Sequence, residues 1–177
     1  TELNDALSKA QVLNNIALIY KDLSNVQYAE RYLLQALDIY EKNDDKVHKA
    51  VTLNYLGNVH WKNNHLQDAL NYYMQALRVR EQIGDQSAIA SSYNNLGLIY
   101  RDLKDSAKSI SFYTKAFDLF SNMNNHKEAA KVLNNIGDVY YYFGNQANAL
   151  NYFSRSNKIC KNINDIKFAK KLAKIKT

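Results

Sequence analysis

Four asparagines recur at a constant spacing of 40 residues, and their side chains offer the clearest binding chemistry in this chain. The four are Asn14, Asn54, Asn94 and Asn134; we call such a set a column and name it by its first position. An amide both donates and accepts hydrogen bonds, so a row of asparagines can pair with the backbone of an extended peptide whatever its sequence. The alternative is that these amides bond neighbouring helices and fix the packing. Beside this column lies a second row, Asn15, Asn95 and Asn135, which Tyr55 interrupts.

The residue types that usually carry catalysis or bind metals show no comparable pattern. The four histidines, His48, His60, His65 and His126, have no cysteine or carboxylate at zinc-finger or His-Glu-x-x-His spacing. The sequence also has no Gly-rich phosphate loop and no Gly-x-Ser-x-Gly elbow. His60 stands in a column of tyrosines, which favours a packing role. We therefore predict no enzyme activity, no cofactor and no metal site.

The asparagines belong to an eight-residue phrase that returns four times: LNNIALIY from Leu13, LNYLGNVH from Leu53, YNNLGLIY from Tyr93 and LNNIGDVY from Leu133. A fixed period of this size indicates a repeat protein, whose units stack on one another because none can bury its apolar face alone. The 177 residues include no proline and only five glycines, a composition that favours helix throughout. We therefore expect helices to carry the asparagines.

Two columns of short polar residues predict where these helices begin. Positions 5, 45, 85, 125 and 165 hold Asp, Asp, Asp, Asn and Asp, whose side chains accept hydrogen bonds from the first turn of a helix. A second column, Asn25, His65, Asp105 and Asn145, contains three more good caps. Each unit is therefore predicted to be helix A, a tight turn and helix B, with bounds near 46–62 and 66–83 in the second unit.

Within helix A, the apolar columns 13, 16, 17 and 20 fall on one stripe, which we expect to face the core. Column 17 contains Ala17, Gly57, Gly97 and Gly137. A glycine in mid-helix costs up to about 1 kcal/mol in propensity. The expected compensation is close contact with helix B, where small residues alternate with large ones.

At these residues the chain resembles the tetratricopeptide repeat family, with large, large, Gly or Ala, large in helix A and Ala, aromatic, Ala in helix B. The unit here is 40 residues, against about 34 in the usual repeat, and the proline that usually ends helix B is absent. The variant is most similar to repeats of kinesin light chains, cell-polarity scaffolds and bacterial signalling proteins. The resemblance implies one all-α domain, 1–177, a right-handed α-α superhelix of helical hairpins. Its parts are repeat 1 (5–44), repeat 2 (45–84), repeat 3 (85–124), repeat 4 (125–164) and a capping half-repeat (165–177).

The resemblance also implies that helix A lines a concave groove, which places columns 11, 14, 18, 21 and 22 on the binding face. Columns 18, 21 and 22 alternate with a period of 80 residues. Repeats 1 and 3 carry Leu18, Lys21, Asp22 and Leu98, Arg101, Asp102, and repeats 2 and 4 carry Asn58, Trp61, Lys62 and Asp138, Tyr141, Tyr142. We expect Trp61, Tyr141 and Arg101 to anchor a ligand, because aromatic residues and arginine dominate binding energetics. The alternative is that Trp61 and Tyr141 pack against the next repeat.

The predicted function is a protein or peptide interaction module that binds an extended segment in this groove, as part of a larger signalling or regulatory protein. The family's clamp for two carboxylates requires lysine in the column of Asn14, so recognition of a chaperone-type C-terminus is not expected. One alternative is a sensor whose bound peptide controls a linked output domain. Another is a self-associating scaffold joined through apolar residues at an exposed end, such as Phe168 and Leu172.

Charge and hydropathy limit the other partners. The net charge is +6, and from Arg155 onward eight Lys or Arg residues stand against one acidic residue, Asp165. We interpret this basic end as the solvated face of a terminal helix and expect no nucleic-acid partner; nucleic-acid binding through it is the alternative. No apolar run reaches membrane-span length and no signal peptide opens the chain, so we expect no membrane partner. Since the chain starts at Thr1 we expect a piece of a longer protein, and its lone Cys160 fits the cytoplasm.

Overall fold

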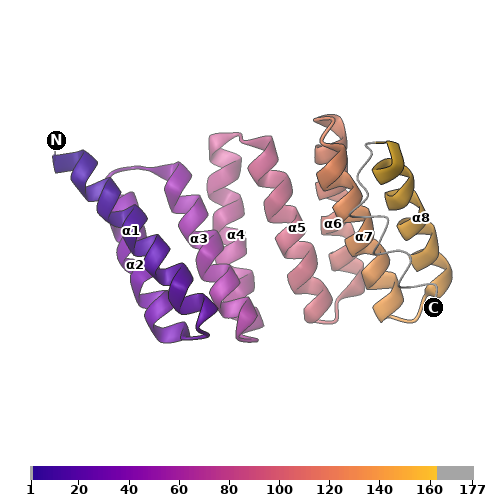
Figure 1. The fold of residues 1–177 in the computed structure, drawn as a ribbon, viewed down its shortest axis with the longest axis horizontal. Helices are drawn as coiled ribbons and strands as arrows, with labels where there is room; N and C mark the ends of the chain where they lie inside the picture. The colour runs from indigo at the N-terminus through magenta and orange to yellow at the C-terminus, as the bar shows by residue number, and fades with distance from the viewer. Residues whose placement is uncertain (1, 163–177) are drawn as a thin grey trace. The chain divides into compact units, whose positions relative to one another are not determined.

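The computed structural model describes residues 2–162, which form eight α-helices and no strand. The helices are α1 (Glu2–Asp22), α2 (Val26–Lys42), α3 (Lys46–Lys62), α4 (Leu66–Ile83), α5 (Gln86–Asp102), α6 (Ser106–Asn122), α7 (His126–Tyr142) and α8 (Gln146–Asn162) (Figure 1). This confirms the predicted all-α class. Among the described helices, none combines the length and the apolar composition that crossing a bilayer requires. The predicted capping half-repeat, with Asp165, Phe168 and Leu172, lies outside the described residues.

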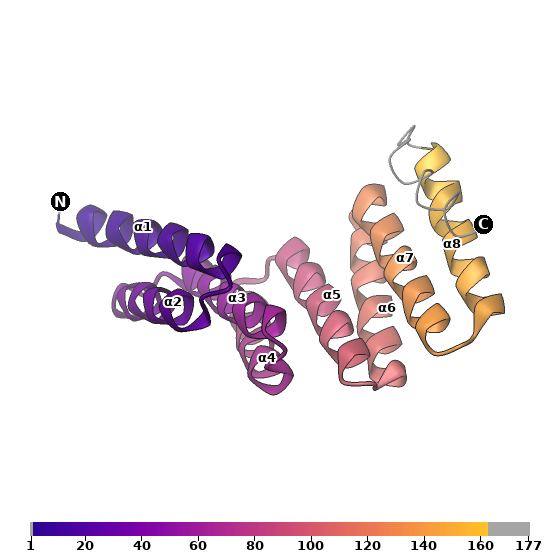
Figure 2. The same cartoon turned by 60° about the horizontal axis from the view of Figure 1, so that its bottom comes forward.

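The chain divides into two compact units: unit 1 is Thr1–Asp85 with α1 to α4, and unit 2 is Gln86–Thr177 with α5 to α8. In unit 1, α1 packs against α2, α2 against α3 and α3 against α4. Unit 2 has the same order from α5 to α8, visible as a row of helices in Figure 2. The odd-numbered helices are the A helices, and they also touch within each unit, α1 with α3 and α5 with α7. Each unit is therefore a stack of two helical hairpins.

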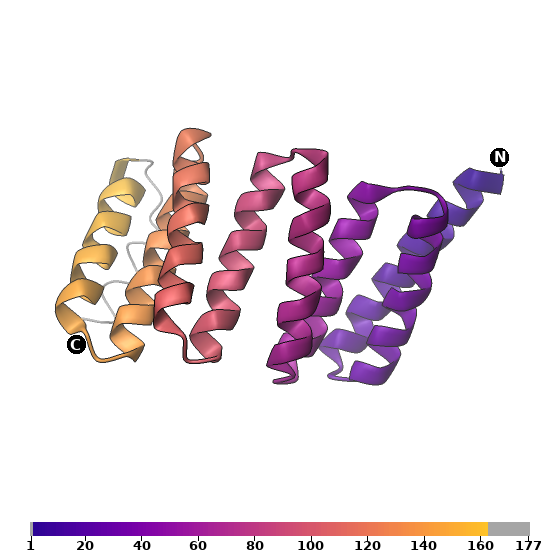
Figure 3. The ribbon, with the colours of Figure 1, turned by 180° about the vertical axis from the view of Figure 1, so that it is seen from behind.

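Short polar side chains begin many of the helices, as their columns predict. The caps that accept a hydrogen bond from the backbone N–H three residues on are Asn25, Asp45, Asp105, Asn125 and Asn145. The turns between helices A and B, seen from the other side in Figure 3, pass through a residue with positive φ: Ser24, Asn64, Lys104 or Gly144. The bounds 46–62 and 66–83 match α3 and α4.

One cap prediction is wrong. Asp5 lies inside α1, which begins at Glu2. Residues Glu2 to Asn4 contain no glycine or proline, so nothing in them stops the helix from extending past the expected cap. The predicted caps Asp45 and Asn125 are confirmed, and a tight turn precedes each of them.

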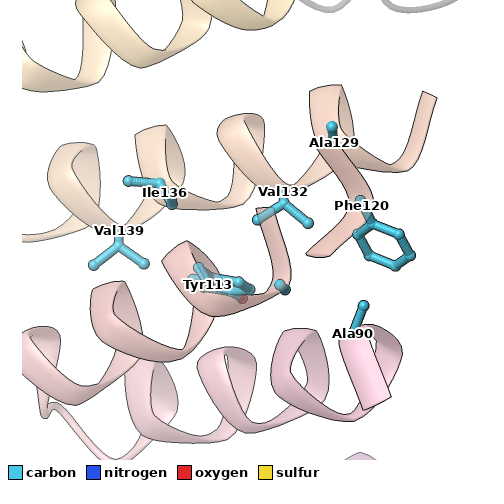
Figure 4. Close-up of a cluster of buried hydrophobic side chains, with 8 residues drawn as sticks. Ala90, Tyr113, Phe120, Ala129, Val132, Ile136 and Val139 are labelled. Atoms are coloured by element: carbon cyan, nitrogen blue, oxygen red, sulfur yellow. The ribbon is translucent and has the colours of Figure 1, made fainter. Parts of the chain in front are cut away.

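The cores form where the apolar stripe of an A helix meets the preceding hairpin. In unit 2, Val132, Ile136 and Val139 of α7 pack with Tyr113 of α6 (Figure 4). In unit 1, Leu53, Leu56 and Val59 of α3 occupy the matching place against α2 and α4. Columns 13, 16 and 17 are mostly buried, as predicted, and column 19 joins them in repeats 2 to 4, whereas the tyrosines of column 20 are only half-buried.

The glycines of column 17 sit directly against aromatic rings of helix B. A Cβ on Gly97 would lie 2.7 Å from the ring of Tyr113, and Cβ atoms on Gly57 and Gly137 would lie 2.5 and 2.6 Å from their rings. Repeat 1 pairs Ala17 with Leu33 at the same place. Burial raises the pKa of the Tyr113 phenol, so the ring stays neutral under this contact. The close helix contact expected from the glycines is therefore confirmed.

Gly97→Ala tests this contact. Alanine in mid-helix would by itself stabilise the helix by up to about 1 kcal/mol. The added methyl overlaps a fully buried ring, so we expect a net loss of about 1–2 kcal/mol in the free energy of unfolding, measured by urea denaturation. Adding Tyr113→Leu reproduces the Ala17–Leu33 pair, and the double variant should lose less than the sum of the two single losses. A Gly97→Ala protein as stable as the wild type would contradict this account of the helix spacing.

Candidate functional site

In unit 1, the asparagine column is tied into the contact between neighbouring A helices. Asn14 on α1 is only 6% exposed, and its Nδ2 donates to Oγ1 of Thr52 on α3 at 2.9 Å. Thr52 is itself fully buried. Asn54 is half-buried and is also engaged within the protein. The interpretation that these amides fix the repeat interface therefore describes Asn14 well.

In unit 2, the same column behaves differently. Nδ2 of Asn135 donates to Oδ1 of Asn94 at 2.9 Å, which links α7 to α5. Asn134 is 5% exposed, and its buried Oδ1 has no hydrogen-bond partner among residues 2–162. A buried amide oxygen left unpaired costs about 1–3 kcal/mol, and such an atom marks a place where a ligand can donate.

Asn134 is one of the residues that line a cavity of about 390 Å³ on the face of α5 and α7. Both asparagine rows line it, through Asn94, Asn95, Asn134 and Asn135. Two residues of column 11, Ser91 and Lys131, line it as well. Glu128 completes the polar rim and contacts the Lys131 ammonium group. The wall is rich in amides and carries one charge of each sign.

A second cleft of about 600 Å³ lies where α5 and α7 end. Four predicted site residues line it, Arg101, Asp138, Tyr141 and Tyr142, together with Asp102 and Gln146. Tyr141 is 60% exposed, so within the described residues it does not pack into a neighbouring repeat. Lys104 Nζ lies 4.1 Å from the centre of the Tyr142 ring and holds that ring by a cation–π contact. Arg101 Nη2 is paired with Asp102 Oδ1 at 2.8 Å.

Repeat 2 places its predicted site residues in contacts within unit 1. Lys62 Nζ donates to the carbonyl of Lys21 at 2.9 Å and so caps the end of α1. Asn58 accepts a hydrogen bond from the phenol of Tyr73 at 2.7 Å. Trp61 is half-buried and also has an intramolecular partner. A ligand that uses Lys62 or Asn58 must replace one of these bonds.

Sequence reasoning missed three contributors. Thr52 pairs with Asn14, and the available signal was a polar residue in a column that contains Val12 and Val132. Glu128 enters the first cavity from the start of α7, and Gln146 enters the second cleft from the start of α8. Glu128 lies one turn before Lys131 on the same face of α7, so extending the projected stripe by one turn would have included it. Gln146 belongs to a B helix, and only the stacking of the helices brings it to the cleft.

Known proteins that resemble this chain share its arrangement of stacked helical hairpins. A family model described as tetratricopeptide repeat matches residues 8–82 and 88–162. The apo form of RapI is 21% identical with a TM-score of 0.83, over 94% of this chain and 46% of that chain. A Rap protein complexed with Competence and Sporulation Factor is 22% identical with a TM-score of 0.80, over 93% of this chain and 46% of that chain. No curated protein matches the sequence.

A third similar structure is a signal transduction ATPase with numerous domains and a tetratricopeptide repeat sensor, from Pyrococcus horikoshii. It is 20% identical with a TM-score of 0.82, over 92% of this chain and 25% of that chain. The present chain spans less than half the length of each of these proteins. At these identities the likeness concerns the fold.

Two matched substitutions distinguish an asparagine that stabilises the fold from one whose side-chain oxygen is unpaired. Asn14→Leu leaves the buried Thr52 hydroxyl without its partner, so we expect the free energy of unfolding to fall by about 1–3 kcal/mol. Asn134→Leu replaces an amide whose oxygen is already unpaired by an apolar group of similar size, so stability should stay unchanged or rise by about 1 kcal/mol. Urea denaturation of both variants makes the comparison. Equal losses would show that the two amides have the same structural role.

Proposed function

The chain belongs to the tetratricopeptide repeat family, and on that premise we propose that it is an interaction module that binds an extended peptide segment along its A helices. The observation that carries the proposal is the amide-lined cavity of unit 2, whose wall includes Asn134 with an Oδ1 that has no partner among the described residues. A peptide backbone N–H is the donor that this oxygen lacks. The asparagines around it supply both donors and acceptors to an adjoining backbone.

The second cleft supplies selectivity in this proposal. Each neutral hydrogen bond to the backbone adds only about 0.5–1.5 kcal/mol, so an amide row alone binds weakly and tolerates many sequences. Tyr141 and Tyr142 present ring surface at the cleft, and the Arg101–Asp102 pair forms its polar edge. Exposed aromatic residues beside an arginine are the composition of binding hot spots. An apolar or aromatic side chain of the peptide fits this surface.

Unit 2 carries most of the binding in this proposal. Asn14, Asn58 and Lys62 already have partners within unit 1, so a ligand gains less by displacing those bonds. Trp61 and Asn54 remain the unit 1 candidates, because each is only half-buried. A module of this kind works by binding and has no catalytic role, and a linked domain would carry any output.

A peptide-responsive sensor is the second candidate function. Its support is that one similar structure is a signal transduction ATPase described as having a tetratricopeptide repeat sensor, and another is a Rap protein complexed with Competence and Sporulation Factor. Interaction module and sensor use the same face of the A helices. They differ in whether ligand binding changes the activity of a domain linked to this chain.

Peptide selection tests the proposed site. A peptide selected from a random library on the immobilised 177-residue chain and then synthesised serves as the probe, with its dissociation constant measured by calorimetry. Asn134→Ala should weaken binding by about 0.5–1.5 kcal/mol, and Tyr141→Ala by more than about 2 kcal/mol. Asn151→Ala and Leu150→Ala, at exposed positions of α8, are the matched controls and should leave affinity unchanged.

Peptide chemistry identifies the bond to Asn134. Methylating the backbone nitrogens of the selected peptide one at a time should reveal one N–H whose loss is costly with the wild-type chain. The same methylation should cost nothing extra with Asn134→Ala, because the acceptor is already gone. Wild-type affinity in both Asn134→Ala and Tyr141→Ala, with the fold intact, would rule out this site.

A further inference from the structure

Repeat 2 carries a group of metal-ligating side chains where its neighbours have packing residues. His60 lies in the last turn of α3, His65 directly precedes α4, and Asp68 lies in the first turn of α4. One ligand atom from each residue lies within 4.8 Å of the others. All three flank the single short turn that joins α3 to α4 (Figure 1).

The imidazole of His60 is buried and its orientation is fixed by neighbouring side chains. The residue is 6% exposed, and its ring stacks on Tyr72 with the centroids 5.2 Å apart. Nε2 lies 3.2 Å from Oε1 of Glu30 on α2. Because an ionised carboxylate can only accept, Nε2 carries a hydrogen toward Glu30, and Nδ1 is the ring nitrogen on the side of Asp68. Nδ1 is buried and has no hydrogen-bond partner in the part of the chain that the structure describes, since Oδ2 of Asp68, 3.8 Å away, is too far for a hydrogen bond.

The other repeats use the same two columns for packing. In repeat 1, Tyr20 stacks on Tyr28 with the centroids 5.0 Å apart. In repeat 3, Lys108 Nζ lies 5.2 Å from the centre of the Tyr100 ring. Repeat 2 has His60 and Asp68 at these positions. The fold therefore does not itself require a histidine and a carboxylate here.

Two further residues depart from their columns in the same place. His65 stands in a column whose other members cap a helix, but its side chain makes no cap hydrogen bond, and a missing cap costs about 1 kcal/mol. Glu30 stands in a column whose other members are Leu70, Ile110 and Leu150. Repeat 2 thus gives up a cap, and a carboxylate on α2 replaces an apolar contact. A shared function of the four polar residues explains why they depart together.

We propose that His60 Nδ1, His65 and Asp68 bind a divalent transition-metal ion of the zinc class, with Glu30 orienting the His60 ring. Imidazole and carboxylate are ligands for such ions, and three protein ligands leave a position for water. A metal-binding histidine usually donates its other ring N–H to a carboxylate, and His60 donates to Glu30 in this way.

The geometry needs only small adjustment. Bonds of about 2.0–2.2 Å in a tetrahedral site place the ligand atoms about 3.3–3.6 Å apart. The present spread of up to 4.8 Å closes by rotation of His65 and Asp68, whose side chains are exposed.

A bound ion would join the end of α3 to the start of α4, and Glu30 would extend that link to α2. The site adds a role to the packing position that the sequence predicted for His60, and it departs from the prediction that the chain has no metal site. It is independent of peptide binding.

Metal titration of the tag-free chain tests the proposal, with Zn²⁺ followed by calorimetry and Co²⁺ by its visible absorption. We expect one ion per chain, a four-coordinate Co²⁺ spectrum and a higher melting temperature with Zn²⁺. His65→Ala and Asp68→Ala, both at exposed positions, should abolish this binding. Glu30→Gln should weaken it about 10- to 100-fold while leaving all three ligands in place.

Three further variants control for loss of folding and for metal binding at other histidines. His60→Tyr restores the residue type of its column, so it should fold with wild-type helicity and bind no metal. His126→Ala and His48→Ala should bind as the wild type does. His48 is the stricter control, because its Nδ1 lies 2.7 Å from Asp45 Oδ2 in a partly buried histidine–carboxylate pair. Absence of one-to-one binding, binding that survives His65→Ala and Asp68→Ala, or binding lost in His48→Ala would each overturn the proposal.

Discussion

The contact between an aromatic ring of helix B and a glycine of helix A sets the geometry on which the rest of this structure depends. In repeats 2 to 4 the ring occupies the space that a Cβ would fill, so the two helices approach as closely as backbone and ring allow. That contact fixes how helix A is rotated, with columns 16 and 17 inward and columns 14 and 18 toward the next A helix or solvent. Repeat 1 keeps the spacing with Ala17 and Leu33, which divide the volume between the two helices differently.

Sequence reasoning predicted what depends on local chemistry. The cap columns and the 40-residue period predicted the bounds of α3 and α4, and they failed at Asp5, where no turn precedes the helix. Projecting helix A identified Asn94 and Asn134, which line one cavity, and Tyr141, which lines another. It could not predict how the amides pair, because the choice of Thr52 or Asn135 as partner depends on distances between helices about 40 residues apart in the chain.

Asparagines in one column thus differ in their hydrogen bonding. Asn14 shares its amide with a buried hydroxyl, whereas the oxygen of Asn134 is buried without a partner. The same residue type satisfies the periodic pattern in both repeats, so the sequence gives no sign of the difference. What separates them is the partner: the hydroxyl of Thr52 on the next A helix pairs with Asn14, whereas no donor among the described residues reaches the Asn134 oxygen.

Within each unit the helices contact their neighbours in sequence and the A helix of the adjoining hairpin. Stability in such an array is close to a sum over hairpins and their interfaces, so a substitution is felt by one hairpin and those that flank it. One repeat can therefore change its residues without requiring compensating changes in a core shared by all repeats. Repeat 2 illustrates this, because it has a histidine where the other repeats have tyrosine. In a chain of similar repeats, one repeat can acquire new chemistry while the others maintain the stacked fold.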